Sequence, residues 1–154
     1  MLTELCKYLR NWFDETPAKD RLPYWEGEFT ISSGVLVGFS DRLLNGQYFR
    51  ISGSLLNDGV WKYPPKTTNP ADLKDETFTG IVQSMAIPPD VVALDAEISE
   101  WRTANAAALN SPYQSESFGG YSYSLKSGSA SAGVIGGVSW QNQFAARLSP
   151  WRKI

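Results

Sequence analysis

Histidine is absent from this chain of 154 residues, and cysteine occurs once, at Cys6. Without histidine, the chain has no imidazole to act as a general base or to bind a metal ion. Ser-His-Asp and Cys-His catalytic sets are therefore excluded, and so are zinc sites with imidazole ligands. A single cysteine cannot form a thiolate zinc cage or an intrachain disulfide, which is typical of a protein from a reducing cytoplasm.

Long hydrophobic runs are also lacking. No apolar run approaches the roughly 20 residues that a membrane-spanning helix requires, and residues 1–7 lack the basic-then-apolar layout of a secretory signal. The formal net charge is −2, with no run of five like charges, so a sequence-independent nucleic-acid surface is not indicated. We expect a soluble, unsecreted protein.

Charge is scarce between residues 111 and 139, where only Glu116 and Lys126 are charged. Such a segment cannot bury enough apolar surface to hold a shape alone. It is nevertheless too aromatic for a solvated linker, with Tyr113, Phe118, Tyr121 and Tyr123. We expect an arm that orders against a partner, which favours assembly over catalysis.

Amphipathic patterns predict three helices. Residues 2–13, residues 89–108 and a segment that opens near Ser139 repeat apolar side chains at spacings of three and four. Ser139 is a suitable N-cap, and Pro150 bends or ends the last helix. The apolar series of that helix is Trp140, Phe144, Leu148 and Trp151.

Residues 24–83 have the character of strands. Short runs rich in β-branched and aromatic residues alternate with turn residues, including Ser33-Gly34 and Asp58-Gly59. The five predicted strands are 28–31, 35–39, 47–53, 60–63 and 77–82. They favour a small antiparallel sheet or a partly closed barrel.

The predicted fold class is α+β: a small helical bundle of three main helices with an inserted antiparallel β-hairpin sheet or small barrel. Residues 1–110 form the predicted core domain, which consists of helix 2–13, the β module 24–83 and helix 89–108. Residues 111–154 form a predicted flexible arm with a C-terminal docking helix.

Carboxylates offer little basis for catalysis. The candidate acid and base residues of the second helix scatter around its polar arc, as on a solvated face: Asp90, Asp95, Glu97 and Glu100. Asp72, Asp75 and Glu76 lack the oxygen spacing and the central glycine of a calcium loop. We therefore expect no catalytic residues, no metal and no cofactor.

Aromatic residues on the predicted strands permit two interpretations. They could stack sugars or single-stranded bases, or pack in the core at alternate strand positions. Only Arg50 and Lys62 lie among them, which argues against a basic groove for nucleic acid. A monomeric module that binds a glycan or a host surface stays open as an alternative, and it predicts exposed coplanar rings. The residues concerned are Trp25, Tyr48, Phe49, Trp61 and Tyr63.

Two segments and the mid-chain helix resemble a known family. Residues 115–123 read Ser-Glu-Ser-Phe-Gly-Gly-Tyr-Ser-Tyr, and residues 148–154 read Leu-Ser-Pro-Trp-Arg-Lys-Ile. They resemble the head–tail connector (neck adaptor) proteins of long-tailed bacteriophages and prophages, which often carry a Ser-Glu-Ser-hydrophobic-Gly-x-Tyr-Ser stretch and end on a basic aromatic tail. The resemblance covers residues 85–154. Typical adaptors are mainly helical, so residues 24–83 represent an insertion, which looks similar to uncharacterised prophage neck proteins.

The resemblance implies a non-enzymatic virion protein of the neck, present in the host cytoplasm during assembly. It implies a homo-oligomeric ring, a dodecamer, between the portal protein and the head-closure or tail-completion proteins. DNA would pass through this ring without sequence-specific binding, and no membrane would be involved.

Interface energy usually concentrates in a few Trp, Tyr and Arg side chains. We therefore expect the partner interface at Tyr121, Tyr123, Trp140, Trp151 and Arg152. The spacing of Trp140, Phe144 and Leu148 is equally typical of a helix that closes the subunit's own core.

Overall fold

The chain divides into two compact units. A computed structural model describes residues 1–17, 22–68, 70–106, 109, 113–117, 122–125 and 139–154. One unit comprises residues 2–89, and the other comprises residues 90–154 together with Met1. Much of the expected flexible arm lies outside the described residues, and the boundary expected near residue 110 stays a prediction.

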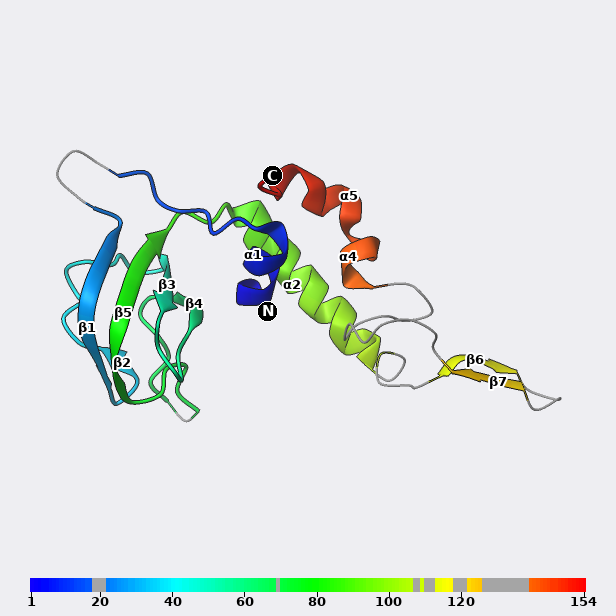
Figure 1. The fold of residues 1–154 in the computed structure, drawn as a ribbon, viewed down its shortest axis with the longest axis horizontal. Helices are drawn as coiled ribbons and strands as arrows, with labels where there is room; N and C mark the ends of the chain where they lie inside the picture. Colours follow the sequence, from blue (N-terminus) through cyan, green and yellow to red (C-terminus); the bar gives the residue numbers. More distant parts are fainter. Residues whose placement is uncertain (18–21, 69, 107–108, 110–112, 118–121, 126–138) are drawn as a thin grey trace. The chain divides into compact units, whose positions relative to one another are not determined.

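An antiparallel five-stranded sheet forms the body of the first unit. Its strands are β1 (Tyr24–Ser32), β2 (Val35–Leu36), β3 (Tyr48–Ser52), β4 (Gly59–Lys62) and β5 (Glu76–Met85). The order across the sheet is β2-β1-β5-β3-β4, so β5, the last of these five strands in sequence, lies in the centre (Figure 1). The sheet has the shape of a half-barrel. Both predicted hairpins are confirmed, since β1 pairs with β2 and β3 pairs with β4.

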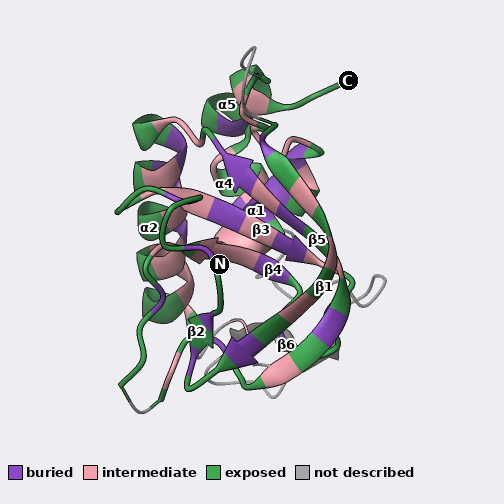
Figure 2. Cartoon of the chain, turned by 90° about the vertical axis from the view of Figure 1, so that its left-hand side faces the viewer, coloured by how far each residue is buried: buried purple, intermediate pink, exposed green. Residues whose placement is uncertain are grey.

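Alternation along the strands explains which face is buried. Along β1 and β3, residues of greater and lesser burial alternate, and the colours of Figure 2 follow this period. The inner face packs with side chains from the loops on one contiguous core. Its buried members are Ile31, Leu36, Phe39, Leu43, Phe49, Ile51, Leu73, Phe78 and Val82.

A close approach of two strands depends on Gly80 of β5. A Cβ atom built at this position would lie 2.1 Å from the backbone oxygen of Ser52, at the end of β3. No side chain fits in that space, so glycine allows β3 and β5 to meet here.

The first helix is shorter than predicted. α1 spans Leu2–Leu9, whereas the apolar spacing indicated a helix over residues 2–13. Arg10 adopts a φ of 53°, its N–H donates to the Lys7 carbonyl, and the Asn11 N–H donates to the Cys6 carbonyl. These two bonds form a Schellman motif, which ends the helix although no glycine is present.

The residues after α1 contact the sheet instead of extending a helical stripe. The Arg50 guanidinium of β3 lies 3.7 Å from the centroid of the Trp12 ring. Asp14 forms a β-bridge with Met85, and its carboxylate accepts a hydrogen bond from the Gln83 side chain. A cation–π contact of this kind contributes about 0.5–1 kcal/mol when exposed. The contact between Arg50 and Trp12 holds the Trp12 ring against the sheet.

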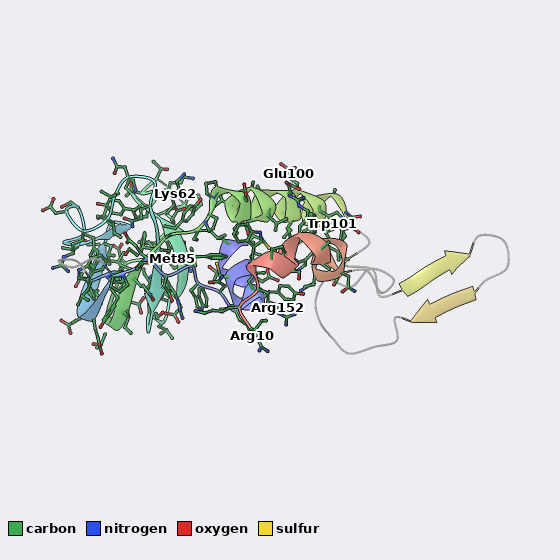
Figure 3. All side chains as sticks on the ribbon, turned by 90° about the horizontal axis from the view of Figure 1, so that it is seen from above. Arg10, Lys62, Met85, Glu100, Trp101 and Arg152 are labelled. Carbon is green, nitrogen blue, oxygen red and sulfur yellow. The ribbon has the colours of Figure 1, made fainter. Side chains whose placement is uncertain are left out.

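The second unit contains one long helix, a strand pair and short terminal helices. Trp101 of α2, labelled in Figure 3, meets Phe144 edge-on, with ring centroids 6.4 Å apart. On α2, Val91, Leu94 and Ile98 are buried. The elements are α2 (Pro89–Ala104), β6 (Tyr113–Ser117), β7 (Ser122–Leu125), α4 (Trp140–Gln143), α5 (Ala145–Leu148) and η1 (Ser149–Trp151), a 3₁₀ turn.

The predicted N-cap of the last helix is confirmed, but the helix itself is interrupted. The Ser139 hydroxyl accepts a hydrogen bond from the Asn142 N–H. Phe144 then adopts φ −103° and ψ 10°, which separates α4 from α5. Each of these two helices has only four residues.

The predicted fold class is wrong. The structure is mostly a five-stranded antiparallel half-barrel with a few short helices, and it is not a three-helix bundle. The Schellman motif shortens the first expected helix, and the break at Phe144 divides the third. In the described part of the chain, α2 with 16 residues is therefore the one helix of the expected kind.

Candidate interaction surface

Two consecutive carboxylates at the start of β5 hold the two loops that flank this strand. We refer to Asp75 and Glu76 as the acidic pair. Asp75 reaches the turn between β1 and β2, and Glu76 reaches the loop between β3 and β4. Because β1 and β3 lie on opposite sides of β5, the acidic pair fixes both loops at one end of the sheet.

Asp75 fixes the turn of the first hairpin. Its Oδ1 accepts a hydrogen bond from the Gly34 N–H at 2.9 Å. Ser33 and Gly34 both have positive φ angles, 53° and 73°, as a two-residue type I′ turn requires. The bond from Gly34, with a second from the Ser33 backbone, lowers the pKa of Asp75 because both favour the charged carboxylate.

Glu76 accepts hydrogen bonds from four successive residues of the second loop. The donors are the Ser54 hydroxyl, the Leu55 and Leu56 N–H groups and the Asn57 side-chain amide. The pKa of Glu76 is lowered, chiefly by the Ser54 hydroxyl. A single charged group thus fixes the loop backbone.

Asn57 holds the same loop from within. Its side chain is 1% exposed, donates to the Lys74 carbonyl at 3.0 Å and accepts from the Lys74 N–H at 2.8 Å. The Asn57 carbonyl accepts from the indole N–H of Trp61. The local sequence pattern predicted no site at Asp75 and Glu76, and none at Asn57. Their partners lie 17 to 41 residues away in sequence, so no local pattern could reveal these bonds.

Large exposed apolar side chains lie on the β3–β4 loop, and in and directly after β2, which follows the turn bound by Asp75. We define the apolar loop end as Val35, Val37, Leu55 and Leu56, all of which are exposed. Leu55 is the extreme case, with 89% of its surface exposed. Single exposed leucines are ordinary, but four exposed apolar residues on two segments next to the acidic pair favour an interaction surface. A fixed backbone lowers the entropy lost on binding.

Two of the five predicted interface residues belong to the expected arm that precedes the terminal helices. Tyr121 lies outside the described residues. Tyr123 belongs to β7, where its backbone is the register partner of Glu116 in β6. Their roles at an interface stay predictions.

The other three predicted interface residues lie in the terminal helices. Trp140 is 1% exposed within the single chain, which agrees with the alternative that this helix closes the subunit's own core. Trp151 is half-buried and lines a hollow of about 300 Å³ with Asp90, Ala93, Leu94 and Arg147. Arg152, labelled in Figure 3, is exposed.

The aromatic residues of the sheet mostly face the core. Phe49 is buried, while Trp25, Trp61 and Tyr63 pack against the core from its margin. Tyr48 lies on the opposite face, where the Lys62 ammonium is 5.9 Å from its ring centroid. The arrangement therefore offers little of the exposed coplanar array that a glycan-binding sheet requires.

Three of the four carboxylates predicted to lie on a solvated face of α2 are exposed, but Asp95 is half-buried and its Oδ1 is buried. Glu97 forms a two-point ion pair with Arg147 of α5, which lowers the pKa of Glu97 and raises that of Arg147. Asp90 and Glu100 are exposed. Among the described residues, no group of three or more acidic or cysteine side chains could hold a metal ion.

Comparison of the chain with protein-family models, with curated proteins and with solved structures found no match. Of the helices in the described ranges, none has the length and apolar character needed to cross a membrane.

Proposed function

We propose that this chain is a structural subunit of the neck of a long-tailed bacteriophage. It forms a homo-oligomeric ring between the portal protein and the head-closure or tail-completion proteins. The observation that carries the proposal is the apolar loop end, where Leu55 and Leu56 stand on backbone bonded to Glu76, and Val35 and Val37 follow the turn bonded to Asp75. The resemblance of residues 115–123 and 148–154 to neck adaptors is the reason for proposing a phage neck as the assembly.

The chemistry of three carboxylates with lowered pKa values supports assembly over catalysis. Asp75 and Glu76 hold loops, and Glu97 holds Arg147. Each has a lowered pKa, so each stays ionised near neutral pH and is a weak base. Such groups serve poorly as general acids or bases, which need a pKa near the working pH. They serve well as fixed hydrogen-bond acceptors.

The apolar loop end is suited to binding protein. A leucine side chain that passes from exposure to full burial contributes about 1.5–3 kcal/mol. Leu55 and Leu56 are exposed, and their N–H groups are already bonded to Glu76, so little backbone ordering is left to pay for on binding. In the proposed neck, these residues bind an apolar pocket on a neighbouring protein.

The proposal is tested with the full chain, alone and mixed with the portal protein of its phage, by size-exclusion chromatography with light scattering. We expect a ring or a portal complex. A double variant, Leu55→Ser with Leu56→Ser, should weaken that association about tenfold or more, since it removes two apolar contacts.

Leu44→Ser is the matched control, because Leu44 is 64% exposed but lies outside the apolar loop end. It should associate as the parent does. A chain that stays monomeric both alone and with the portal would contradict the proposed function. Equal association of the double variant and the parent would remove the apolar loop end from the interface.

A further inference from the structure

One edge of the sheet has no paired strand in the described structure. β1 pairs with β5 along residues 24–31, but on its other side it meets β2 only at Ile31 and Ser32. Beyond these pairs, the Val37 N–H donates to the Thr30 carbonyl. Within the described part of the chain, no backbone group bonds to the outer edge of residues 24–29.

The direction of the free backbone groups follows from the Thr30 bond. Backbone groups of alternate residues in a strand point to the same edge. The Thr30 carbonyl points outward, so the N–H and carbonyl groups of Tyr24, Glu26 and Glu28 also point outward. All three residues are exposed. An exposed row of unpaired groups is a template for an added strand.

The opposite edge of the sheet is shorter and partly bonded to a helix residue. It is formed by β4, which has four residues. The Val60 N–H of β4 donates to the Thr3 hydroxyl of α1 at 2.9 Å, so a helix residue already occupies part of this edge. The free edge of β1 is thus the longer and less protected of the two.

The second unit holds strands that need a partner. β6 and β7 pair only with each other among the described strands. A two-stranded ribbon is marginally stable in water, and a third strand stabilises it. The free edge of β1 can accept an added strand, and the ribbon of β6 and β7 gains stability from a third strand.

Charge indicates which strand is added. Pairing of β1 with the β1 of another copy would bring Glu26 and Glu28 of both chains close together, and like charges across strands are destabilising. β6 contains Glu116, whereas β7 reads Ser-Tyr-Ser-Leu and carries no charge. β7 is the strand that meets the glutamate-bearing edge without repulsion.

We propose that β7 of one copy adds to the free edge of β1 in the next copy, so that the half-barrel continues into the ribbon of a neighbour. This inference rests on the proposed function, because it requires a homo-oligomer. An edge on one subunit that binds a ribbon on the next is a head-to-tail contact, and such contacts close into rings when their rotation permits.

The test uses the full-length chain. Glu26→Pro removes one outward N–H at an edge position, where proline is tolerated, and Glu26→Ala removes the same side chain but keeps the N–H. Analytical ultracentrifugation should show self-association weakened about tenfold in Glu26→Pro and unchanged in Glu26→Ala. Equal association of both variants with the parent would overturn the inference.

If Glu26→Pro fails to fold, amide hydrogen exchange of the parent chain tests without a substitution whether a strand pairs with the free edge of β1. The Glu26 and Glu28 amides should exchange more slowly in the oligomer than in the monomer. Rings in which these amides still exchange freely would overturn the inference and leave the proposed function intact. A chain that binds the portal but never associates with itself would overturn the inference and would also contradict the homo-oligomeric ring of the proposed function.

Discussion

Three polar side chains, Asp75, Glu76 and Asn57, fix two loops by bonding to backbone groups. Asn57 is buried with its amide paired on both sides to Lys74, and Glu76 accepts from both leucine N–H groups. A buried amide left without these partners would destabilise the fold by about 1–3 kcal/mol. At this scale, hydrogen bonding gives the apolar loop end its shape.

The acidic pair should make stability depend on pH in one direction. The folded-state pKa values of Asp75 and Glu76 are lowered, so their contribution is present above the ordinary values of 3.8 and 4.5 and is lost as pH falls through the folded values. We expect the melting temperature to fall as the pH drops below about 4.5. Thermal unfolding across pH 7 to pH 3 measures this.

Glu76→Gln supplies the comparison for this titration. The variant should melt at a lower temperature than the parent at neutral pH, because an uncharged amide accepts fewer and weaker hydrogen bonds from the loop. Its melting temperature should then fall less than that of the parent as the solution is acidified. An identical fall in both proteins would mean that other carboxylates cause the acid sensitivity.

At the scale of elements, the sheet depends on close contact between β3 and β5. Register pairs join Phe49 to Ser84 and Ile51 to Val82, and the two strands continue to approach as far as Gly80. The space at Gly80 is bounded by backbone, which cannot rotate away as a long side chain can. The half-barrel is therefore intolerant of a side chain at this one position.

Gly80→Ala should destabilise the first unit by more than about 4 kcal/mol, because the new Cβ would force β3 away from β5. Thr79→Ala is the matched control at an exposed neighbouring position and should stay within about 0.5 kcal/mol of the parent. Urea unfolding followed by tryptophan fluorescence compares the two. A stable Gly80→Ala protein would show that the strands can separate locally.

Strands, turns and helix caps could be predicted where they depend on residues close in sequence. Alternating strand residues, the turn at Gly34 and the N-cap at Ser139 depend on residues close in sequence, and all three are found. The end of α1 carried no such signal, because Arg10 adopts the left-handed conformation that usually indicates glycine. The acidic pair was missed because each carboxylate binds a loop 19 or more residues away.

At the scale of the whole molecule, the chain is built from two compact units that differ in kind. The contiguous core of the sheet lies entirely within residues 31–82. The second unit combines a 16-residue helix with a two-stranded ribbon and helices of four residues. The first unit has the larger local supply of buried apolar contacts, so it should be the more stable of the two.

A fragment of residues 1–89 should fold alone. It contains the five strands, their core and both loops held by the acidic pair. Amide NMR spectra of the fragment and the full chain should overlay for the residues of β1 to β5. A fragment that shows the narrow amide dispersion of an unfolded chain would mean that the sheet needs residues 90–154.

The bonds from Glu76 to the β3–β4 loop have a consequence for how this surface can evolve. Glu76 binds the N–H groups of Leu55 and Leu56, which every residue except proline also carries. Substitution at positions 55 and 56 therefore changes what the loop displays and leaves its shape intact. Diverging lineages could exchange binding partners there by single mutations, without passing through an unstable intermediate.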